Sequence, residues 1–419
     1  MSNFSISGFP LVDSDGDVVV RSITTDIVRF SFLGIGAEAS KSYTYGGGLL
    51  GPQNFAYNQH NIETFPFAAE SPIGEHADLG TPSGISIYNS GLASTSNGYF
   101  TGGKYHYGYG PWSNVSSYNR AQKIPFANTS FSTLSNVLGR SRHSHSAHQS
   151  SEHGYTAGGV YQSPYAPGNF LTQVDKFQFS SETVNGFVGS LFPTAGGYGS
   201  SGTSSGSHGF ISGGANSYPT SNIKNFINKF PFSSNFTYAA DIGDLSAERH
   251  HTASQSSSTH GYVSGGYNSP APSGYLFDTI DKLSFSTDGN STDIGNLTVA
   301  RTGGSGSSSK TNGYTIGGGT QPGAPSNVYG TRTIDKFSFA SDGDAVDTGD
   351  DLLYPGFAGF TCNTTTHLHI GGHGSPNPTH EADRQIYALA SGGNATDGGN
   401  QPTGFLNSPS GSSWGGISY

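Results

Sequence analysis

Short hydrophobic stretches that end in a pair of glycines recur along this chain. The pairs begin 52 to 56 residues apart, at Gly46, Gly102, Gly158, Gly213, Gly265, Gly317 and Gly371. A second hydrophobic stretch lies midway in each period, as in Ile-Asp-Lys-Phe-Ser-Phe at 334–339. Its apolar residues fall on both alternating sets of positions, which is typical of a short strand that is at least partly buried on both faces. The regular period indicates one supersecondary unit repeated along the chain.

Two further pieces complete each period. One contains Asp-x-Gly before a leucine, as at 293–297, and the other is small and polar, as at 305–309. Asp-Gly pairs such as Asp342-Gly343 supply hairpin turns, because they adopt positive φ at low cost. Four short strands in each period predict an all-β protein, a seven-bladed β-propeller with four antiparallel strands per blade.

The repeat also sets the predicted domain boundaries. Residues 1–29 are an N-terminal segment, residues 30–400 are the propeller, and residues 401–419 are a C-terminal extension. An unclosed sheet edge invites aggregation, so the last blade needs a strand that completes it. Both the segment 17–23 and the segment 390–400 are candidates for that strand.

The glycine pairs, the Ile-Asp-Lys-Phe-Ser-Phe strand and the arginines Arg249 and Arg301 resemble the kelch repeat across residues 30–390. The tryptophan usual after that family's third strand is missing, and Asp-Ile-Gly-Asp-Leu at 241–245 stands near its place, which argues against the animal kelch subfamilies. The variant with His-Gly-Tyr before the glycine pair is similar to kelch-like repeats in structural proteins of tailed bacteriophages. The resemblance implies a virion protein: a tail, fibre or capsid-surface component.

Composition and charge narrow the class of protein. The 419 residues include 63 glycines, 23 tyrosines and 27 phenylalanines, and only 11% of them are charged. A disordered chain would be richer in charge and poorer in aromatic residues, and a helical protein would be richer in Ala, Leu, Glu and Lys. The net charge of −10 argues against nucleic acid and against an anionic membrane as partners.

The sequence contains few signals that indicate a cellular compartment. The single cysteine, Cys362, excludes an internal disulfide framework and a zinc site built from cysteines. The first residues lack the basic and apolar regions of a secretory signal, and no apolar run approaches the roughly 18 residues of a membrane span. We therefore expect assembly in a host cytoplasm and no membrane insertion. The resemblance to phage structural proteins implies localisation to the virion, in a symmetric oligomeric assembly with other virion proteins.

Residues that recur at one position of the repeat are expected to be structural. They are Gly102, Gly103, Gly158, Gly159, Gly213, Gly214, Gly265, Gly266, Gly317 and Gly318, together with Arg142, Arg249 and Arg301. Each arginine lies sixteen residues before a glycine pair. We expect it to bind neighbouring backbone carbonyls or an aspartate of the next blade.

Metal ligands and enzyme motifs are weakly represented. His143, His145 and His148 form the densest histidine cluster, and alternate residues of a strand share a face, so they are weak candidates for a metal site. No carboxylate lies near them in the sequence to orient them, and we predict no metal and no cofactor. Asp13, Asp15 and Asp17 begin like a calcium loop but lack its later acidic ligand, so a turn is favoured.

The sequence favours a non-enzymatic protein. It has no glycine-rich phosphate loop with its lysine, and the scarcity of glutamate outside the loops disfavours the carboxylate pair of a glycosidase. Kelch folds also house copper radical oxidases with a cysteine joined to a tyrosine, but the position of Cys362 on an expected inner strand favours packing. The alternatives are a carbohydrate-active or metal-dependent propeller enzyme and a cellular kelch-type protein-interaction module.

The loops between the second and third strands vary while the strands repeat. They are rich in Tyr, Ser, Gly, Asn and Pro, a composition typical of adaptable binding surfaces. The candidate binding residues are Tyr105, Tyr107, Tyr109, Trp112, Tyr161, Tyr165, Tyr218, Tyr267, Tyr275 and Tyr329. We predict that this face binds a host cell-surface glycan or a neighbouring virion subunit. The alternative is that these are solvated loops whose tyrosines pack on the blade edges.

Overall fold

In the computed structural model the chain divides into two units, residues 1–30 and residues 31–419, and all described residues belong to the second unit. The described residues are 41–45, 48–49, 57–58, 62–66, 77–78, 90–94, 96–106, 115–125, 132–163, 166–191, 197–216, 222–268, 275–320, 330–351, 359–362, 366–370, 383–389, 394–400 and 417–418. Among them there is no helix that is long and apolar enough to cross a membrane.

The described strands form seven four-stranded antiparallel sheets, so the prediction of an all-β chain built from such sheets is confirmed. The first three sheets, in spatial order, are β36 (Ile417–Ser418), β1 (Lys41–Tyr45), β4 (Ile62–Pro66) and β5 (Ala77–Asp78); β6 (Ser90–Ala93), β7 (Asn97–Thr101), β10 (Ala121–Pro125) and β11 (Ser132–Leu134); and β12 (Ser146–Gln149), β13 (His153–Ala157), β16 (Gln173–Gln178) and β17 (Val184–Ser190).

The other four sheets follow the same order. They are β18 (Ser201–Ser204), β19 (His208–Ala215), β20 (Ile223–Pro231) and β21 (Ala240–Asp244); β22 (Ala253–Ser256), β23 (His260–Ser264), β26 (Thr279–Ser284) and β27 (Thr292–Asn296); β28 (Ser305–Ser308), β29 (Asn312–Ile316), β30 (Thr333–Ser338) and β31 (Val346–Asp351); and β32 (Gly359–Cys362), β33 (Thr366–Ile370), β34 (Asp383–Ala388) and β35 (Thr396–Asn400).

Four two-stranded ribbons extend from the glycine pairs between the second and third strands of their sheets. They are β2 (Gly48–Leu49) with β3 (Tyr57–Asn58), β8 (Lys104–His106) with β9 (Val115–Ser117), β14 (Val160–Ser163) with β15 (Ala166–Phe170), and β24 (Tyr267–Asn268) with β25 (Tyr275–Leu276). The loops predicted to carry function therefore begin as paired strands.

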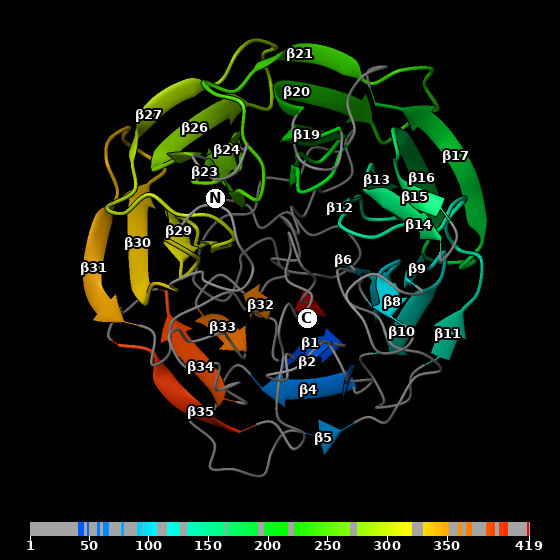
Figure 1. Cartoon of the computed structure of the whole chain (residues 1–419), viewed down its shortest axis with the longest axis horizontal. Coiled ribbons are helices and arrows are strands. Elements are labelled where there is room, and N and C mark those ends of the chain that lie inside the picture. The colour runs from blue at the N-terminus through cyan, green and yellow to red at the C-terminus, as the bar shows by residue number, and fades with distance from the viewer. Residues whose placement is uncertain are drawn as a thin grey trace, which may run out of the picture. The chain divides into compact units, whose positions relative to one another are not determined.

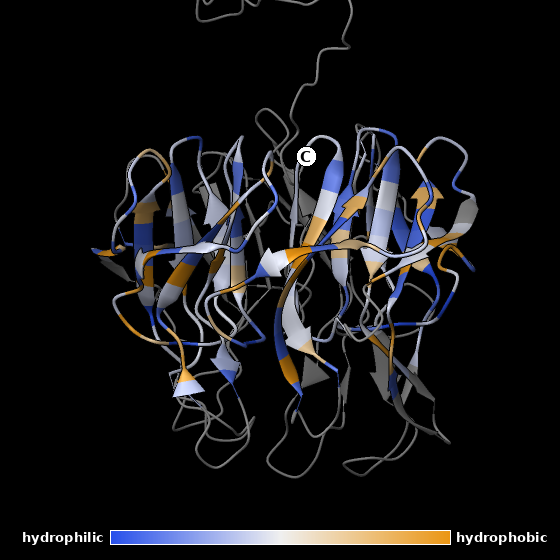
Figure 2. Ribbon diagram, turned by 90° about the horizontal axis from the view of Figure 1, so that it is seen from above, coloured by the Kyte–Doolittle hydropathy of each residue, from blue (hydrophilic) through white to orange (hydrophobic). Residues whose placement is uncertain are grey.

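The hydrophobic core lies between neighbouring sheets. Tyr155 of β13 stacks on Phe232, which follows β20, with ring centroids 4.6 Å apart, and Tyr262 of β23 stacks on Phe339, which follows β30, at 4.8 Å. The second strands are buried over nearly their whole length, which explains why their apolar residues do not alternate with polar ones. Hydrophobic and hydrophilic segments are interspersed along the strands seen from the side (Figure 2).

The small first strands of successive sheets contact one another. The contacts run from β6 through β12, β18, β22 and β28 to β32, and β36 contacts both β32 and β6. Figure 1 shows β6, β12 and β32 toward the middle, with β11, β17, β21, β27, β31, β35 and β5 farthest out. Small residues suit the inner position: a Cβ on Gly306 of β28 would lie 2.1 Å from the Ser254 carbonyl oxygen of β22.

Both ends of the repeat region take part in sheets. Residues 396–400 of the segment 390–400, one of the two candidates for completing the last sheet, form the fourth strand of that sheet, β35. The other candidate, 17–23, lies outside the described residues. Within the segment predicted as a C-terminal extension, Ile417 and Ser418 pair with Tyr43 and Ser42 of β1 and so add the innermost strand of the first sheet.

Candidate functional site

A buried arginine anchors the segment that leads into three of the sheets. Arg249 lies before β22, and its guanidinium donates to Asp281 of β26 at 2.5 Å and to the Val263 carbonyl at 3.2 Å. Both charged side chains are fully buried. Burial lowers the pKa of Arg249, and the nearby carboxylate of Asp281 partly offsets that shift.

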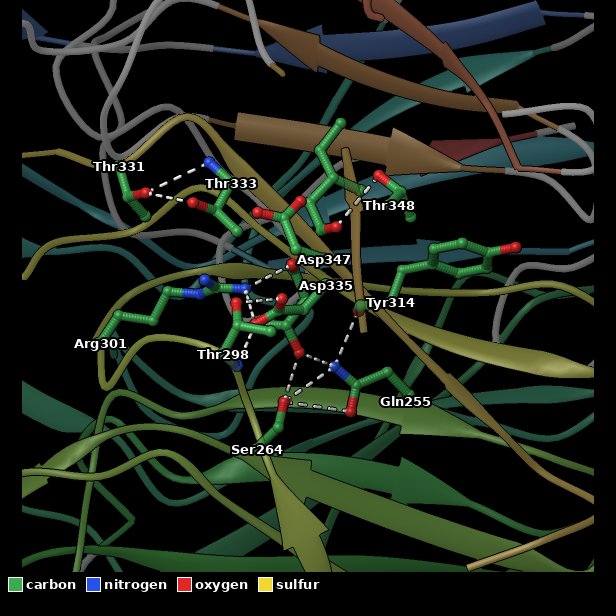
Figure 3. A network of polar contacts seen from close by, with 12 residues as sticks. Gln255, Ser264, Thr298, Arg301, Tyr314, Thr331, Thr333, Asp335, Asp347 and Thr348 are labelled. Atoms are coloured by element: carbon green, nitrogen blue, oxygen red, sulfur yellow. Dashed lines mark hydrogen bonds and ion pairs between the residues drawn. The ribbon is translucent and has the colours of Figure 1, made fainter. Parts of the chain in front are cut away.

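The same ion pair recurs as Arg142 with Asp175 and as Arg301 with Asp335. Figure 3 shows Arg301 directed at Asp335, with Thr298 beside the same carboxylate, and the Thr298 hydroxyl donates to it at 2.6 Å. Thr298 follows β27 of the preceding sheet, whereas Asp335 lies in β30 of the next one. Each aspartate therefore ties two neighbouring sheets together.

The repeat between those of Arg142 and Arg249 lacks both members of the pair. Gly197 stands where these three repeats have arginine, and Asn228 of β20 stands where they have aspartate. A Cβ on Gly197 would lie 3.1 Å from the Gly158 Cα, so backbone occupies this space. The absence of both the arginine and the aspartate is physically consistent, because a single buried charge without its partner is strongly destabilising.

A four-residue turn begins at each of these positions. Its third residue is Ser144, Gly199, His251 or Gly303, with φ of 51°, 64°, 51° and 64° respectively. The turns are linked to one another, because the His251 amide donates to the Gly199 carbonyl at 2.8 Å and the Gly303 amide donates to the His251 carbonyl at 2.8 Å. The second residue of each turn bridges to the segment after a glycine pair, as His250 does with Tyr267 of β24. Turns and ribbons thus share one side of the sheets, the loop face.

Aromatic rings gather where two of these turns meet on the loop face. Tyr198 meets the ring of His251 edge-on at 5.3 Å, and it meets Phe170, at the end of β15, at 6.0 Å. Tyr267 stacks on His251 at 5.9 Å and lies 4.0 Å from the ring of His250. His250 is fully buried, and the other four residues are half-buried. These five residues form the aromatic–histidine cluster, our candidate functional site.

The two histidines of the cluster are neutral at pH 7. Burial lowers the pKa of His250 to about 4, and burial together with the neighbouring His250 lowers the pKa of His251 well below its ordinary value. His250 Nδ1 donates to the Tyr267 carbonyl at 2.9 Å, which leaves Nε2 as an acceptor. That buried Nε2 has no hydrogen-bond partner among the described residues. Chemically, the cluster offers flat uncharged rings and one buried acceptor.

The described tyrosines of the predicted binding face lie on the ribbons. Tyr161 of β14 and Tyr267 are half-buried, whereas Tyr275 of β25 is 75% exposed. Tyr105 belongs to β8. Six other predicted binding residues, Tyr107, Tyr109, Trp112, Tyr165, Tyr218 and Tyr329, lie outside the described residues.

The glycine pairs adopt backbone conformations that favour glycine. All ten predicted residues, from Gly102 and Gly103 to Gly317 and Gly318, have φ between 61° and 106°. At Gly265, a Cβ would also lie 2.6 Å from the Arg301 carbonyl oxygen. The glycine pair that begins at Gly265 therefore lets the backbone pack directly against the backbone of the next turn.

The histidines weighed as metal ligands have separate hydrogen-bonding roles. His145 Nε2 lies 3.1 Å from the Thr101 hydroxyl, and His148 Nδ1 donates to the Thr203 carbonyl of β18 at 3.1 Å. His143 Nδ1 lies 3.0 Å from the Ser144 hydroxyl. Within the part of the chain that the structure describes, no group of three or more His, Cys, Asp or Glu side chains could hold a metal ion.

Sequence reasoning missed several contacts between repeats. Lys229 and Lys282, each in the third strand of its sheet, pair with Asp288 and Asp342 of the next repeat at 2.7 Å. The separations of 59 and 60 residues are the signal that could have revealed them. Phe170 and Tyr198 were also overlooked, because neither stands at a recurring position.

Comparison with known proteins bears on the fold. No family model matches the chain, and no curated protein matches it. Among solved structures, it is similar to one titled "Structure of YjhT", with a TM-score of 0.56 and 11% sequence identity over 74% of this chain and 97% of that chain. At that identity the likeness concerns the fold alone.

Proposed function

We propose that this chain is a non-enzymatic structural protein of a tailed-bacteriophage virion, a tail, fibre or capsid-surface component. Its loop face binds a host surface glycan or a neighbouring virion subunit, within a symmetric oligomeric assembly. The seven sheets are the blades of one kelch-like propeller. The contacts that run from β6 through the other first strands to β36 and return to β6 support this arrangement.

The aromatic–histidine cluster carries the functional part of the proposal. A hydrophobic core is formed between the sheets without these half-buried rings, which lie instead on the loop face between ribbons. Rings held by neighbouring turns and strands bind at low entropic cost, because little freedom remains to be lost. The ribbon residue Tyr275, 75% exposed, adds an aromatic contact on a variable loop.

Genomic context tests the virion assignment most directly. Sequencing the DNA on both sides of the gene should reveal genes for portal, capsid or tail proteins. Neighbours that encode a metabolic pathway instead would contradict the assignment. Elemental analysis of the purified protein adds a second check, because stoichiometric zinc or copper would favour the metal-dependent enzyme.

A glycan array tests the binding face. The purified chain should bind a subset of bacterial surface saccharides, and Tyr109→Ala with Trp112→Ala should weaken that binding. Tyr238→Ala is the matched control, since Tyr238 is also exposed, at 54%, but precedes β21 away from the ribbons. If the double variant and the control bind alike, these loop residues have no part in recognition.

A further inference from the structure

The aromatic–histidine cluster occurs at a turn whose neighbour is built from smaller residues. The turn before β28 has Thr302 and Gly303 where the turn before β22 has His250 and His251. The left-handed conformation of His251, φ 51°, is the one that Gly303 adopts at φ 64°. Residues with a side chain pay a steric cost in this conformation, so histidine at this position is not what the fold requires.

His250 carries a second cost. Its Nδ1 donates to the Tyr267 carbonyl, and within the part of the chain that the structure describes its buried Nε2 has no hydrogen-bond partner. A buried acceptor without a donor destabilises the folded state. Such a cost persists at a site where a ligand supplies the missing donor, because binding then recovers it.

The surroundings of His250 indicate the class of ligand. Tyr198, His251 and Tyr267 present half-buried rings, and Tyr267 lies 4.0 Å from the His250 ring. Both imidazoles are neutral at pH 7, because burial lowers the pKa of each. Flat uncharged rings suit the C–H face of a sugar, and a hydroxyl is the donor that an imidazole nitrogen accepts.

We infer that the aromatic–histidine cluster is a subsite for an uncharged saccharide ring. The sugar packs against Tyr198 and Tyr267, and one of its hydroxyls donates to His250 Nε2. Because that atom is buried, binding requires the half-buried rings around it to move apart. This inference rests on the proposed glycan binding and assigns it to named residues between the turns at 197–200 and 249–252.

The neighbouring repeat supplies the test variant. His250→Thr with His251→Gly introduces the residues of the 301–304 turn, so the left-handed turn is retained and the buried acceptor is removed. We expect the melting temperature to stay the same or rise by a few degrees. We expect affinity for the saccharide that the wild-type chain binds best on the array to fall about tenfold or more, measured by calorimetry.

Two further variants keep the test decisive. Ser144→Gly removes the steric cost of the same left-handed conformation, φ 51°, in the turn before β12. It should leave the affinity for the saccharide unchanged. Tyr267→Leu removes one ring and keeps the backbone pairing with His250, so it should weaken saccharide binding. This variant provides the test if the histidine variant fails to fold.

The outcomes separate this inference from the proposed function. Wild-type affinity retained in both cluster variants, together with loss of binding in the Tyr109 and Trp112 variant, would overturn the inference and leave glycan binding intact. A wild-type chain that binds no saccharide would overturn the inference and the glycan-binding part of the proposed function, and would leave the contact with a virion subunit. A melting temperature that falls sharply with unchanged affinity would assign the two histidines a structural role and overturn the inference.

Discussion

Removing one charge from the buried pair of Arg249 and Asp281 should cost more than removing both. Asp281→Asn leaves the Arg249 cation in a site where both side chains are fully buried. The asparagine oxygen can still accept from the Ser246 amide, which donates to Asp281 at 3.0 Å, so the main loss is the charge. We expect a decrease of about 3–5 kcal/mol in the free energy of unfolding.

The double variant Arg249→Met with Asp281→Asn removes the unpaired cation as well. It should recover at least about 2 kcal/mol of that loss, because no buried charge remains to be desolvated. The repeat with Gly197 and Asn228 is a neutral counterpart within the same chain. Urea unfolding followed by circular dichroism measures all variants. A double variant as unstable as Asp281→Asn, or a single variant that loses less than about 1 kcal/mol, would refute the reasoning.

Three other predictions concern stability. Burial lowers the pKa of His148 to about 4, against about 6.5 in an unfolded chain, so the folded state binds fewer protons between these values. Stability should therefore fall by up to about 3 kcal/mol as pH falls from 7 to 4, and His148→Gln should show a smaller fall in thermal melts over that range. Gly265→Ala places a Cβ 2.6 Å from a carbonyl oxygen at φ 64°, and it should lower the free energy of unfolding by more than Gly186→Ala does. Gly186→Ala is the control, because it meets only the left-handed cost of about 1–2 kcal/mol. Equal losses of the free energy of unfolding in urea would show that the close contact relaxes. Lys282→Ala breaks the surface ion pair with Asp342, in which the charged atoms lie 2.7 Å apart. It should change the free energy of unfolding by at most about 1 kcal/mol, and this difference should vanish in 1 M salt. A larger loss that does not depend on salt would indicate that the lysine stem has a packing role.

Much of the fold could be predicted because its signals are local. Each described glycine pair adopts positive φ, and pairs such as those that begin at Gly265 and Gly317 can be recognised from a few neighbouring residues. The four-strand period follows from the same local chemistry. The number of strands in each repeat can therefore be predicted without knowledge of contacts between distant residues.

The candidate site could not be predicted in the same way. Phe170, Tyr198 and Tyr267 come from three different repeats, and their contacts arise only from the placement of neighbouring repeats. The signal that was available is departure from the repeat at His251, where the other turns have Ser144, Gly199 and Gly303. A search for positions where one repeat replaces a small residue with a ring would have found His251, whereas a search for recurring residues passes over it.

The pairing of β36 with β1 has a consequence for the order of folding. The middle sheets are each made from consecutive strands, so each can form as soon as its own residues have been synthesised. The first sheet instead waits for Ile417 and Ser418, which are made hundreds of residues after their partners Tyr43 and Ser42. Until then β1 has an open edge with which another nascent chain can pair. Chains synthesised close together on one messenger are therefore the ones most at risk of exchanging this strand.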